Sequence, residues 1–243
     1  VDFLGSLGGE LFLTADDGIE GAELWKTDGT STGTMMVKSI YPGPSSSAPA
    51  DGLVVGDAIY FSASDGLPGK LWRTDGTAAG TLPVATVGST PADRPTQLTR
   101  LANALVFTVE GDLWRSDGSA AGTQRIADLN GMSLEFERSG TRLFVAAHVG
   151  VDQFELWTSD GTAAGTTKIA DFVSAAFLTA LEGGVVFAAN DVVGNGNELW
   201  WSDGSSVGTM QIADLVPGPV GSEPEDLFAA GSRRVYFEAT ENG

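Results

Sequence analysis

The sequence predicts an all-β protein built from repeated four-stranded antiparallel units, and three observations lead to this expectation. A Glu-Leu-Trp-like triplet returns five times in 243 residues, and a segment close to TDGTxxGT follows each copy. The triplets are 42 to 47 residues apart, a period typical of repeats that each form one sheet. Glycine is abundant, with 33 residues, as expected for a turn-rich β protein. The triplet tryptophans are Trp25, Trp72, Trp114, Trp157 and Trp200.

A strand that is apolar on both faces is expected about ten residues before each tryptophan. In the second repeat this strand reads AIYFSAS. One column of the aligned strands contains a large residue, with a smaller one two positions later on the same face. A strand of this kind is expected between two neighbouring sheets. The large residues of the column are Leu13, Phe61, Phe107, Phe144, Phe187 and Phe237.

The other strands of each unit follow from the same alignment. The first is expected near residues 3–4 or 53–55, the third contains the Leu-Trp pair, and the fourth lies near 35–40 or 211–214. Glycine-bearing turns separate the strands, which predicts an antiparallel meander. Four strands per unit, a doubly buried second strand and a period near 43 together predict a blade of a β-propeller. We therefore expect residues 1–243 to form a single β-propeller domain, or part of a longer propeller-containing chain.

The TDGTxxGT-like segment is expected to be a structural hairpin between the third and fourth strands. Its aspartate can accept backbone N–H groups of the loop, and the next glycine can adopt a conformation that other residues resist. Because every repeat carries this segment, we expect it to build the scaffold together with the triplet tryptophans. The aspartates are Asp28, Asp75, Asp117, Asp160 and Asp203.

The repeats resemble the bacterial ELWxxDGT repeat family. They read ELWKTDGTSTGT, KLWRTDGTAAGT, DLWRSDGSAAGT, ELWTSDGTAAGT and ELWWSDGSSVGT, and the linkers 40–49 and 215–224 share a Pro-Gly pair with a later Ser and Pro. The resemblance implies a β-propeller-like architecture in large secreted or surface-attached bacterial proteins, and no common enzymatic activity. Lys70 and Asp112 replace the usual Glu, so a carboxylate at this position is expected to be helpful and not indispensable.

Five full repeats are followed by one surplus strand pair. Residues 2–16 and 225–240 are both copies of the first two strands of a unit, so they duplicate each other and do not combine into one blade. Three explanations remain open: a longer polypeptide, a five-bladed ring with one pair outside it, and a pair that docks on another subunit.

Composition excludes several classes of function. The chain contains 32 Asp and Glu against 13 Lys and Arg, a net charge of −19. We therefore expect no nucleic-acid partner, because such binding depends on basic residues that neutralise phosphates. No apolar stretch is long enough to span a membrane. Cysteine is absent, which excludes disulfides, thiolate metal sites and cysteine nucleophiles.

Two oxygen-rich loops between second and third strands are candidate metal sites. Carboxylate and amide oxygens are the ligands that Ca²⁺ prefers, although neither loop has the spacing of a helix–loop–helix calcium site. Calcium is therefore the candidate cation, an ordinary polar turn is the alternative reading, and no other cofactor is expected. The candidate ligands are Asp16, Asp17 and Glu20 in the first loop and Asp191, Asn195 and Asn197 in the second.

Catalytic groups are scarce. His148 is the only histidine, so a Ser-His-Asp triad would depend on it alone. Two segments, 29–33 and 204–208, match the GxSxG pattern, but both lie in the hairpin segment, where other repeats carry Ala in place of the serine. Trp201 replaces the Lys, Arg or Thr of the other repeats. We expect it to be more exposed than the triplet tryptophans, which makes it a candidate contact residue.

These observations favour a non-enzymatic binding, adhesion or structural module, extracellular or at the cell surface of a bacterium. The expected partners are a protein or glycan of the cell surface, or copies of the chain itself. One alternative is a subunit of an extracellular fibre or sheath assembled by strand exchange. The other is a propeller hydrolase that acts on polysaccharide through channel carboxylates, which would require non-equivalent acidic residues with raised pKa values to converge.

Overall fold

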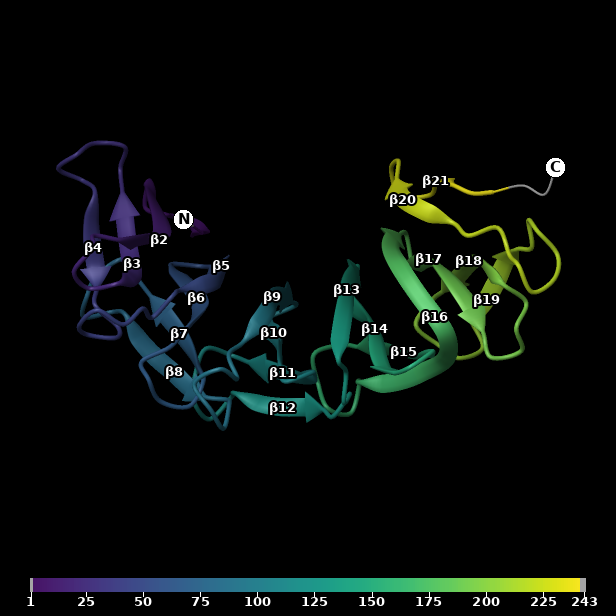
Figure 1. The fold of residues 1–243 in the computed structure, drawn as a ribbon, viewed down its shortest axis with the longest axis horizontal. Coiled ribbons are helices and arrows are strands. Elements are labelled where there is room, and N and C mark those ends of the chain that lie inside the picture. Colours follow the sequence, from purple (N-terminus) through teal and green to yellow (C-terminus); the bar gives the residue numbers. More distant parts are fainter. Residues whose placement is uncertain (1, 241–243) are drawn as a thin grey trace. The chain divides into compact units, whose positions relative to one another are not determined.

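The computed structural model describes residues 2–240, which fold into β-strands, turns and loops without any helix. No helix in this part of the chain could therefore cross a membrane. The chain divides into two compact units, Val1–Arg125 and Ile126–Gly243. Each unit is described by itself, and the strands of both carry the labels of Figure 1.

The first unit consists of three four-stranded antiparallel meanders, one for each repeat (Figure 1). Repeat 1 contains β1 (Phe3–Leu7), β2 (Glu10–Asp16), β3 (Ala22–Thr27) and β4 (Met35–Lys38). Repeat 2 contains β5 (Ala50–Val55), β6 (Ala58–Ala63), β7 (Lys70–Thr74) and β8 (Leu82–Thr86). Repeat 3 contains β9 (Thr96–Leu101), β10 (Ala104–Val109), β11 (Asp112–Ser116) and β12 (Gln124–Ala127), and the boundary between the units falls inside β12.

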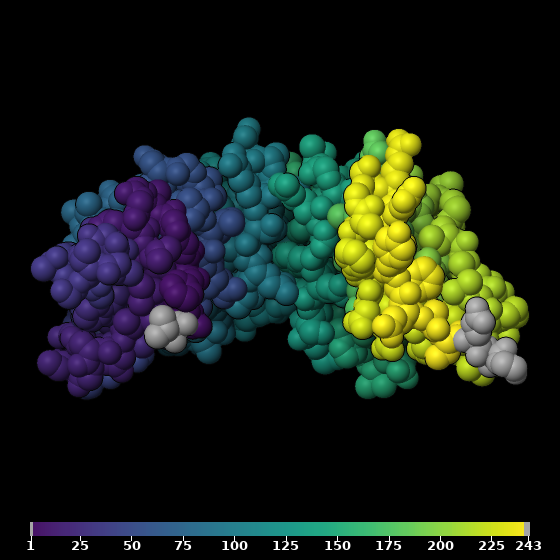
Figure 2. Space-filling model, turned by 90° about the horizontal axis from the view of Figure 1, so that it is seen from above, coloured from purple at the N-terminus to yellow at the C-terminus, as the bar shows by residue number. Residues whose placement is uncertain are grey.

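The second unit contains a seven-stranded sheet and a strand pair. Repeats 4 and 5 share one sheet because β16 is both the last strand of repeat 4 and the first strand of repeat 5. The sheet contains β13 (Ser133–Ser139), β14 (Arg142–Gly150), β15 (Gln153–Ser159), β16 (Thr167–Leu181), β17 (Gly184–Asp191), β18 (Asn197–Ser202) and β19 (Thr209–Ala213). The surplus pair, repeat 6, is a two-stranded sheet of β20 (Glu225–Ala229) and β21 (Val235–Glu238), drawn in yellow beside the green strands in Figure 2.

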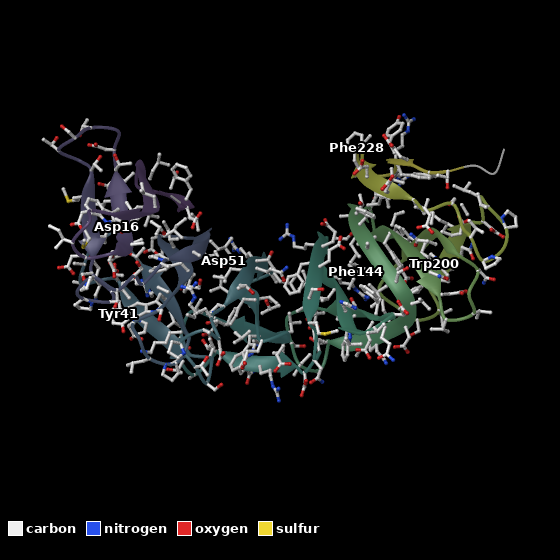
Figure 3. All side chains as sticks on the ribbon, in the orientation of Figure 1. Asp16, Tyr41, Asp51, Phe144, Trp200 and Phe228 are labelled. Carbon is white, nitrogen blue, oxygen red and sulfur yellow. The ribbon has the colours of Figure 1, made fainter. Side chains whose placement is uncertain are left out.

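Consecutive sheets pack by one rule in both units. The third strand of each repeat directs its Leu to one face of the sheet and its Trp to the other, and we call these the Leu face and the Trp face. The Leu face of repeat 1, with Phe12 and Leu24, packs against the Trp face of repeat 2, with Phe61 and Trp72. The Leu face of repeat 2 packs against repeat 3, and that of repeat 4 against repeat 5. Phe144 and Trp200, labelled in Figure 3, belong to this last interface.

The second strands of repeats 2 to 5 are buried on both faces, as the sequence predicted. The prediction is wrong for repeats 1 and 6, because β2 is buried on one face only and β21 has no buried residue. One member of the predicted column is wrong. Val145, and not Phe144, pairs with Trp157, as Phe61 pairs with Trp72. Phe144 lies on the opposite face because a shift of one residue exchanges the two faces of a strand. Both residues are fully buried, so burial alone could not reveal the shift.

The first strands of four repeats contain a bulge with a non-glycine residue at positive φ, which the sequence analysis did not predict. Each bulge places a non-glycine residue at positive φ, between 53° and 59°. The pairing of the strand with its neighbour shifts at the same position. Such residues are strained and persist only where surrounding contacts hold them. The bulge residues are Asp51, Gln97, Phe177 and Asp226.

Candidate functional site

The two ends of each meander have different roles. One end carries the turn between the first and second strands and the TDGTxxGT-like segment, which we call the clasp. The other end carries the turn between the second and third strands and the linker to the next repeat. We call these the clasp end and the linker end. The clasp repeats closely in all five copies, whereas the linker-end loops differ in length and sequence.

Each clasp is held by its own hydrogen bonds. In repeat 2, Asp75 Oδ1 accepts the backbone N–H of Thr77 at 2.9 Å and its hydroxyl at 2.7 Å. The Thr77 hydroxyl oxygen in turn accepts the N–H of Gly80 at 2.9 Å. The bonds from the Thr77 hydroxyl and N–H hold the pKa of Asp75 below its usual value. The same bonds and the same pKa direction occur at Asp28, Asp117, Asp160 and Asp203.

The triplet tryptophans lie within their sheets. Trp72 is buried in the interface between repeats 1 and 2, and the other four are partly buried. Trp201 is also partly buried and lies over Gly184, where an added Cβ would approach the indole. Its exposure is therefore in the same range as that of Trp200, which differs from the sequence expectation. The small residue at Gly184 is the physical reason, because it leaves room for the ring against the sheet.

A buried carboxylate organises the linker in two repeats, a role that the sequence analysis missed. Glu23 and Glu198, the first residues of their triplets, are both 0% exposed. Glu198 accepts the backbone N–H groups of Leu215, Val216 and Ser222 at 3.0–3.1 Å, and the Ser222 hydroxyl at 2.7 Å. Glu23 holds its linker through the same four bonds, from Ile40, Tyr41 and Ser47.

Lys and Asp replace the triplet Glu in repeats 2 and 3, whose linkers lack the Pro-Gly pair. Lys70 forms an ion pair with Asp65, and Asp112 forms one with Arg125. Glu155 forms an ion pair with Lys168 at 3.1 Å and accepts the indole N–H of Trp157. The sequence signal for the buried role was available, because the linkers with Pro-Gly and a later Ser and Pro follow only the first and fifth triplets.

The first candidate metal loop is organised by hydrogen bonds within the protein. Asp16 Oδ1 accepts the N–H of Gly18, and Asp17 Oδ1 accepts the N–H groups of Ile19 and Glu20. The Glu20 carboxylate turns toward the linker, where it accepts the Ser39 hydroxyl and the N–H of Gly43. Each of the three carboxylates thus accepts hydrogen bonds from a different set of donors.

The second candidate loop is similar. Asp191 accepts the backbone N–H groups of Val193, Gly194 and Asn195 and the Asn195 side-chain amide. Asn197 instead donates its side-chain amide to Glu223 at 3.0 Å. Within residues 2–240 no group of three or more His, Asp or Glu side chains is placed to hold a metal ion.

The pKa of Asp93 is lowered further than that of the other described carboxylates, and this leads to a pH prediction. The hydroxyl and N–H of Thr90, with those of Ser89, lower the pKa of Asp93 to about 2. Because the folded pKa is depressed, these bonds stabilise the protein above pH 4 and are lost as the pH falls toward 2. We expect Asp93→Asn to remove this part of the acid destabilisation. An NMR titration of the Asp93 carboxyl should show an inflection near 2, and an inflection near 4 would contradict the assignment.

The largest departure from the repeat pattern creates a hollow of about 310 Å³ at the linker end of the second unit. In repeat 1, residues 39–48 separate Lys38 from the buried Pro49. In repeat 4, only residues 171–174 separate Ala170 from Ala175, because β16 continues straight into repeat 5. Pro49 and Ala175 are equivalent, since each lies two residues before a bulge residue.

A hydrogen bond that closes this position in repeat 1 has no counterpart in repeat 4. Thr14 donates its hydroxyl to the carbonyl of Pro49, the residue equivalent to Ala175. The counterpart of Thr14 in repeat 4 is Ala146, because Thr14 pairs with Leu24 and Ala146 with Leu156. Ala146 lines the hollow. The other lining residues are Ser133, Leu134, Glu135, Phe154, Ser174, Ala175, Ala176, Ala188 and Asn197.

Glu135 is the charged residue of the hollow. Its oxygens accept the N–H of Leu178 at 2.6 Å and of Phe177 at 3.1 Å, so it holds the bulge of the next repeat. Burial raises the pKa of Glu135, and the two hydrogen bonds oppose this effect. Glu137 lies on the same face of β13, and burial also raises its pKa. Neither residue has a counterpart in the repeat pattern, and the sequence analysis did not select either.

Aromatic rings border one side of the hollow. His148 stacks on the lining residue Phe154 with ring centroids 4.5 Å apart and is the cross-strand partner of Ser133. On the other side, the second-loop candidate Asn197 pairs across the sheet with Asn190. The side-chain carbonyl oxygens of Asn190 and Asn197 are both buried and have no hydrogen-bond donor among the described residues. Strand pairing places both side chains on the Leu face of repeat 5, opposite to the face that packs on repeat 4.

Comparison with known proteins supports the fold and no more. No known protein family profile matches the chain, and no curated protein sequence matches it. Solved structures with a similar fold are β-propeller proteins. A structure from a study of two prolyl endopeptidases has a TM-score of 0.56 at 12% identity, and the match covers 98% of this chain and 39% of that one.

Two further matches have lower scores. A puromycin hydrolase mutant gives a TM-score of 0.47 at 17% identity, with 90% of this chain and 40% of that chain covered. TolB from Acinetobacter baumannii gives 0.45 at 12% identity, with 95% and 58% covered. The chain thus spans about two fifths of the length of the hydrolase and the endopeptidase.

Proposed function

We propose that this chain is a β-propeller-type, non-enzymatic binding or adhesion module of a bacterial secreted or surface protein of the ELWxxDGT kind. Its ligand site is the hollow at the linker end of the second unit, and its partner is a protein or glycan of the cell surface. The observation that carries the proposal is the contrast between the two ends of the repeats. Clasp aspartates bond to their own loops in every copy, whereas the linker end departs from the pattern and opens a hollow.

A pair of alanine substitutions tests this proposal. Ala176→Leu adds a larger side chain to the lining of the hollow, whereas Ala163→Leu makes the same change on an exposed clasp. On a panel of cell-surface glycans and peptides, we expect Ala176→Leu to weaken binding of the selected ligand by about tenfold or more. Ala163→Leu should bind as the unchanged protein does. Equal loss in both variants, or no loss in either, would contradict a site at the hollow.

A hydrolase is the second candidate, and Glu135 with Glu137 is the observation that favours it. Both carboxylates lie at positions without repeat counterparts, and burial raises both pKa values. Such pairs are typical of glycosidases, in which one group acts as an acid and the other as a base or nucleophile. Mass spectrometry of the glycans from the same panel separates the two candidates. Cleavage that Glu137→Gln abolishes would favour the hydrolase, and intact glycans would favour the binding module.

A subunit of a fibre is the third candidate, favoured by the exposed face of repeat 6. Phe228 and Tyr236 are 60% and 56% exposed and stack on each other. They correspond to Leu53 and Tyr60 of repeat 2, which pack against repeat 3. A second copy of the chain, with the Trp face of its repeat 1, would continue the same interface. Sedimentation velocity should then show association that Phe228→Lys abolishes, and a monomer at high concentration would contradict it.

A further inference from the structure

Two loops of repeat 4 carry an exposed apolar side chain next to the residues that line the hollow. Met132 directly precedes the lining residue Ser133. Val151 lies in the turn between β14 and β15, which leads to the lining residue Phe154. The backbone N–H of Met132 donates to the carbonyl of His148 at 2.7 Å, so the two loops lie side by side.

Repeat 5 carries three exposed valines at the same end. Val192 and Val193 lie in the turn between β17 and β18, and this turn leads to the lining residue Asn197. Val220 belongs to the linker, which meets the start of β18 through a bridge between Gly221 and Asn197. Met132, Val151 and these valines are all between 65% and 85% exposed. Apolar side chains exposed on several loops around one hollow indicate an interaction surface.

The basic residues of the second unit lie away from this surface. Its arginines are located in or beside turns between first and second strands, which belong to the clasp end. The one lysine, Lys168, forms ion pairs with the carboxylates of Glu155 and Asp171. The arginines are Arg138, Arg142, Arg233 and Arg234.

The linker end of this unit is acidic as a result. Asp152 is exposed and directly follows Val151, and Asp191 directly precedes Val192. In the hollow itself, the described hydrogen-bond donors of the Glu135 carboxylate are two neutral backbone N–H groups. Neutral donors leave the negative charge in place, so this end attracts a basic partner and repels an acidic one.

We propose that the linker end of the second unit binds a polypeptide segment in which an aliphatic side chain lies between Lys or Arg residues. The aliphatic side chain enters the hollow, whose lining includes four alanines and Leu134. The basic neighbours lie over the loop carboxylates. Apolar burial supplies the affinity, and the opposite charges select the partner. This inference deepens the proposed function and rests on it, because it selects a protein over a glycan as the partner of the same hollow.

A glycan fits this surface less well. Sugar hydroxyl groups that cover the exposed valines would lose water without gaining a hydrogen bond, which costs free energy. The aromatic lining residue Phe154 is already stacked on His148. An anionic membrane surface fits less well too, since the loop carboxylates repel it.

Three synthetic peptides test the proposal by backbone-amide NMR on the unchanged chain. They are the N-acetylated, C-amidated forms of Lys-Gly-Leu-Gly-Lys, Glu-Gly-Leu-Gly-Glu and Lys-Gly-Ser-Gly-Lys. We expect the first to shift the amides of lining residues such as Ser133, Phe154 and Ala175, with millimolar affinity. The second lacks the charge attraction and the third lacks the apolar side chain, so each should bind at least about tenfold more weakly.

Three valine variants provide the matched comparison. Val151→Ser and Val193→Ser remove exposed apolar surface at the linker end, and each should weaken binding of Lys-Gly-Leu-Gly-Lys about threefold. Val207→Ser makes the same change on a clasp, where Val207 is also exposed, and should leave binding unchanged.

Asp152→Asn tests the charge at a position where Asn is tolerated, because residue 152 has a positive φ of 52°. It should weaken the lysine–leucine peptide and strengthen the glutamate–leucine peptide. Added sodium chloride should have the same two effects, since salt screens both interactions.

The remaining outcomes separate this inference from the proposed function. Equal binding of the basic and acidic peptides, or of the leucine and serine peptides, would overturn the inference. Shifts of the same amides with phosphatidylcholine vesicles and with none of the peptides would also overturn it. If no peptide binds but Ala176→Leu weakens binding of a glycan from the panel, this inference alone fails. If Ala176→Leu also has no effect, the proposed function fails with it.

Discussion

Replacing Glu198 with Gln should destabilise the second unit by about 2 kcal/mol, because its two oxygens accept four hydrogen bonds in a fully buried position. The amide keeps one acceptor oxygen, but its NH₂ group faces at least one of the N–H groups of the linker. Glu198→Ala removes both acceptors and should cost about 3–5 kcal/mol, since a buried donor without an acceptor costs 1–3 kcal/mol. Urea denaturation measures both effects.

Glu155→Gln is the matched control for this prediction. Glu155 stands at the same position of its triplet, but it pairs with the half-exposed Lys168 and receives no linker N–H group. Partly exposed ion pairs contribute little, so we expect a loss of less than about 1 kcal/mol. Hydrogen exchange should show faster opening of residues 215–222 in Glu198→Gln only. Equal losses in both variants would mean that the buried role of the triplet carboxylate is wrong.

The contrast between Glu198 and Glu155 shows what the sequence could predict. The strands, the four-stranded meanders of repeats 1 to 3 and the surplus pair follow from periodicity, because apolar alternation and glycine turns are local properties. The separate four-stranded units predicted for repeats 4 and 5 are wrong, because β16 belongs to both repeats and joins them into one sheet. The role of Glu198 depends on a linker 17 to 24 residues further along the chain. An interpretation that considers each triplet alone assigns all five the same role. It therefore cannot distinguish a buried carboxylate that binds the linker from a partly exposed carboxylate in an ion pair.

The Phe144 register error has a related cause. Repeat 4 has apolar residues at five consecutive positions, 143–147, all of them buried. A strand that is apolar on both faces gives no alternation that could fix its register. The tryptophan partner fixes it instead, and that pairing is a property of the folded sheet.

The candidate site was the least predictable part. Of the metal candidates, Asn197 is a lining residue of the hollow, and its side-chain amide donates to Glu223, which is not one. Glu135 acts on Phe177 and Leu178, which are 42 and 43 residues away. The usable signal was the short, Pro-free connection between repeats 4 and 5, which departs from the linkers that follow repeats 1, 2 and 5.

Gly80→Ala should destabilise the first unit by about 1 kcal/mol, although alanine can adopt the backbone conformation of this residue. The φ of Gly80 is outside the left-handed region, in contrast to Gly76 at +91°. Gly80 is required for space, because an added Cβ would overlap the carboxylate of Asp75. The methyl group must displace the exposed Asp75 carboxylate from its two bonds to Thr77, and because this carboxylate can move, the cost lies at the low end of that of overpacking.

A double-mutant cycle with Asp75→Ala separates crowding from any general effect of the methyl group. Once the carboxylate is removed, Gly80→Ala should be close to neutral, so the effects of the two substitutions should not add. Ala79→Ser, one residue earlier and exposed, should be neutral. If Gly80→Ala costs the same with and without Asp75, the clasp glycine is not selected by its aspartate. Because the same overlap occurs at Gly33, Gly122, Gly165 and Gly208, the coupling should recur in every repeat.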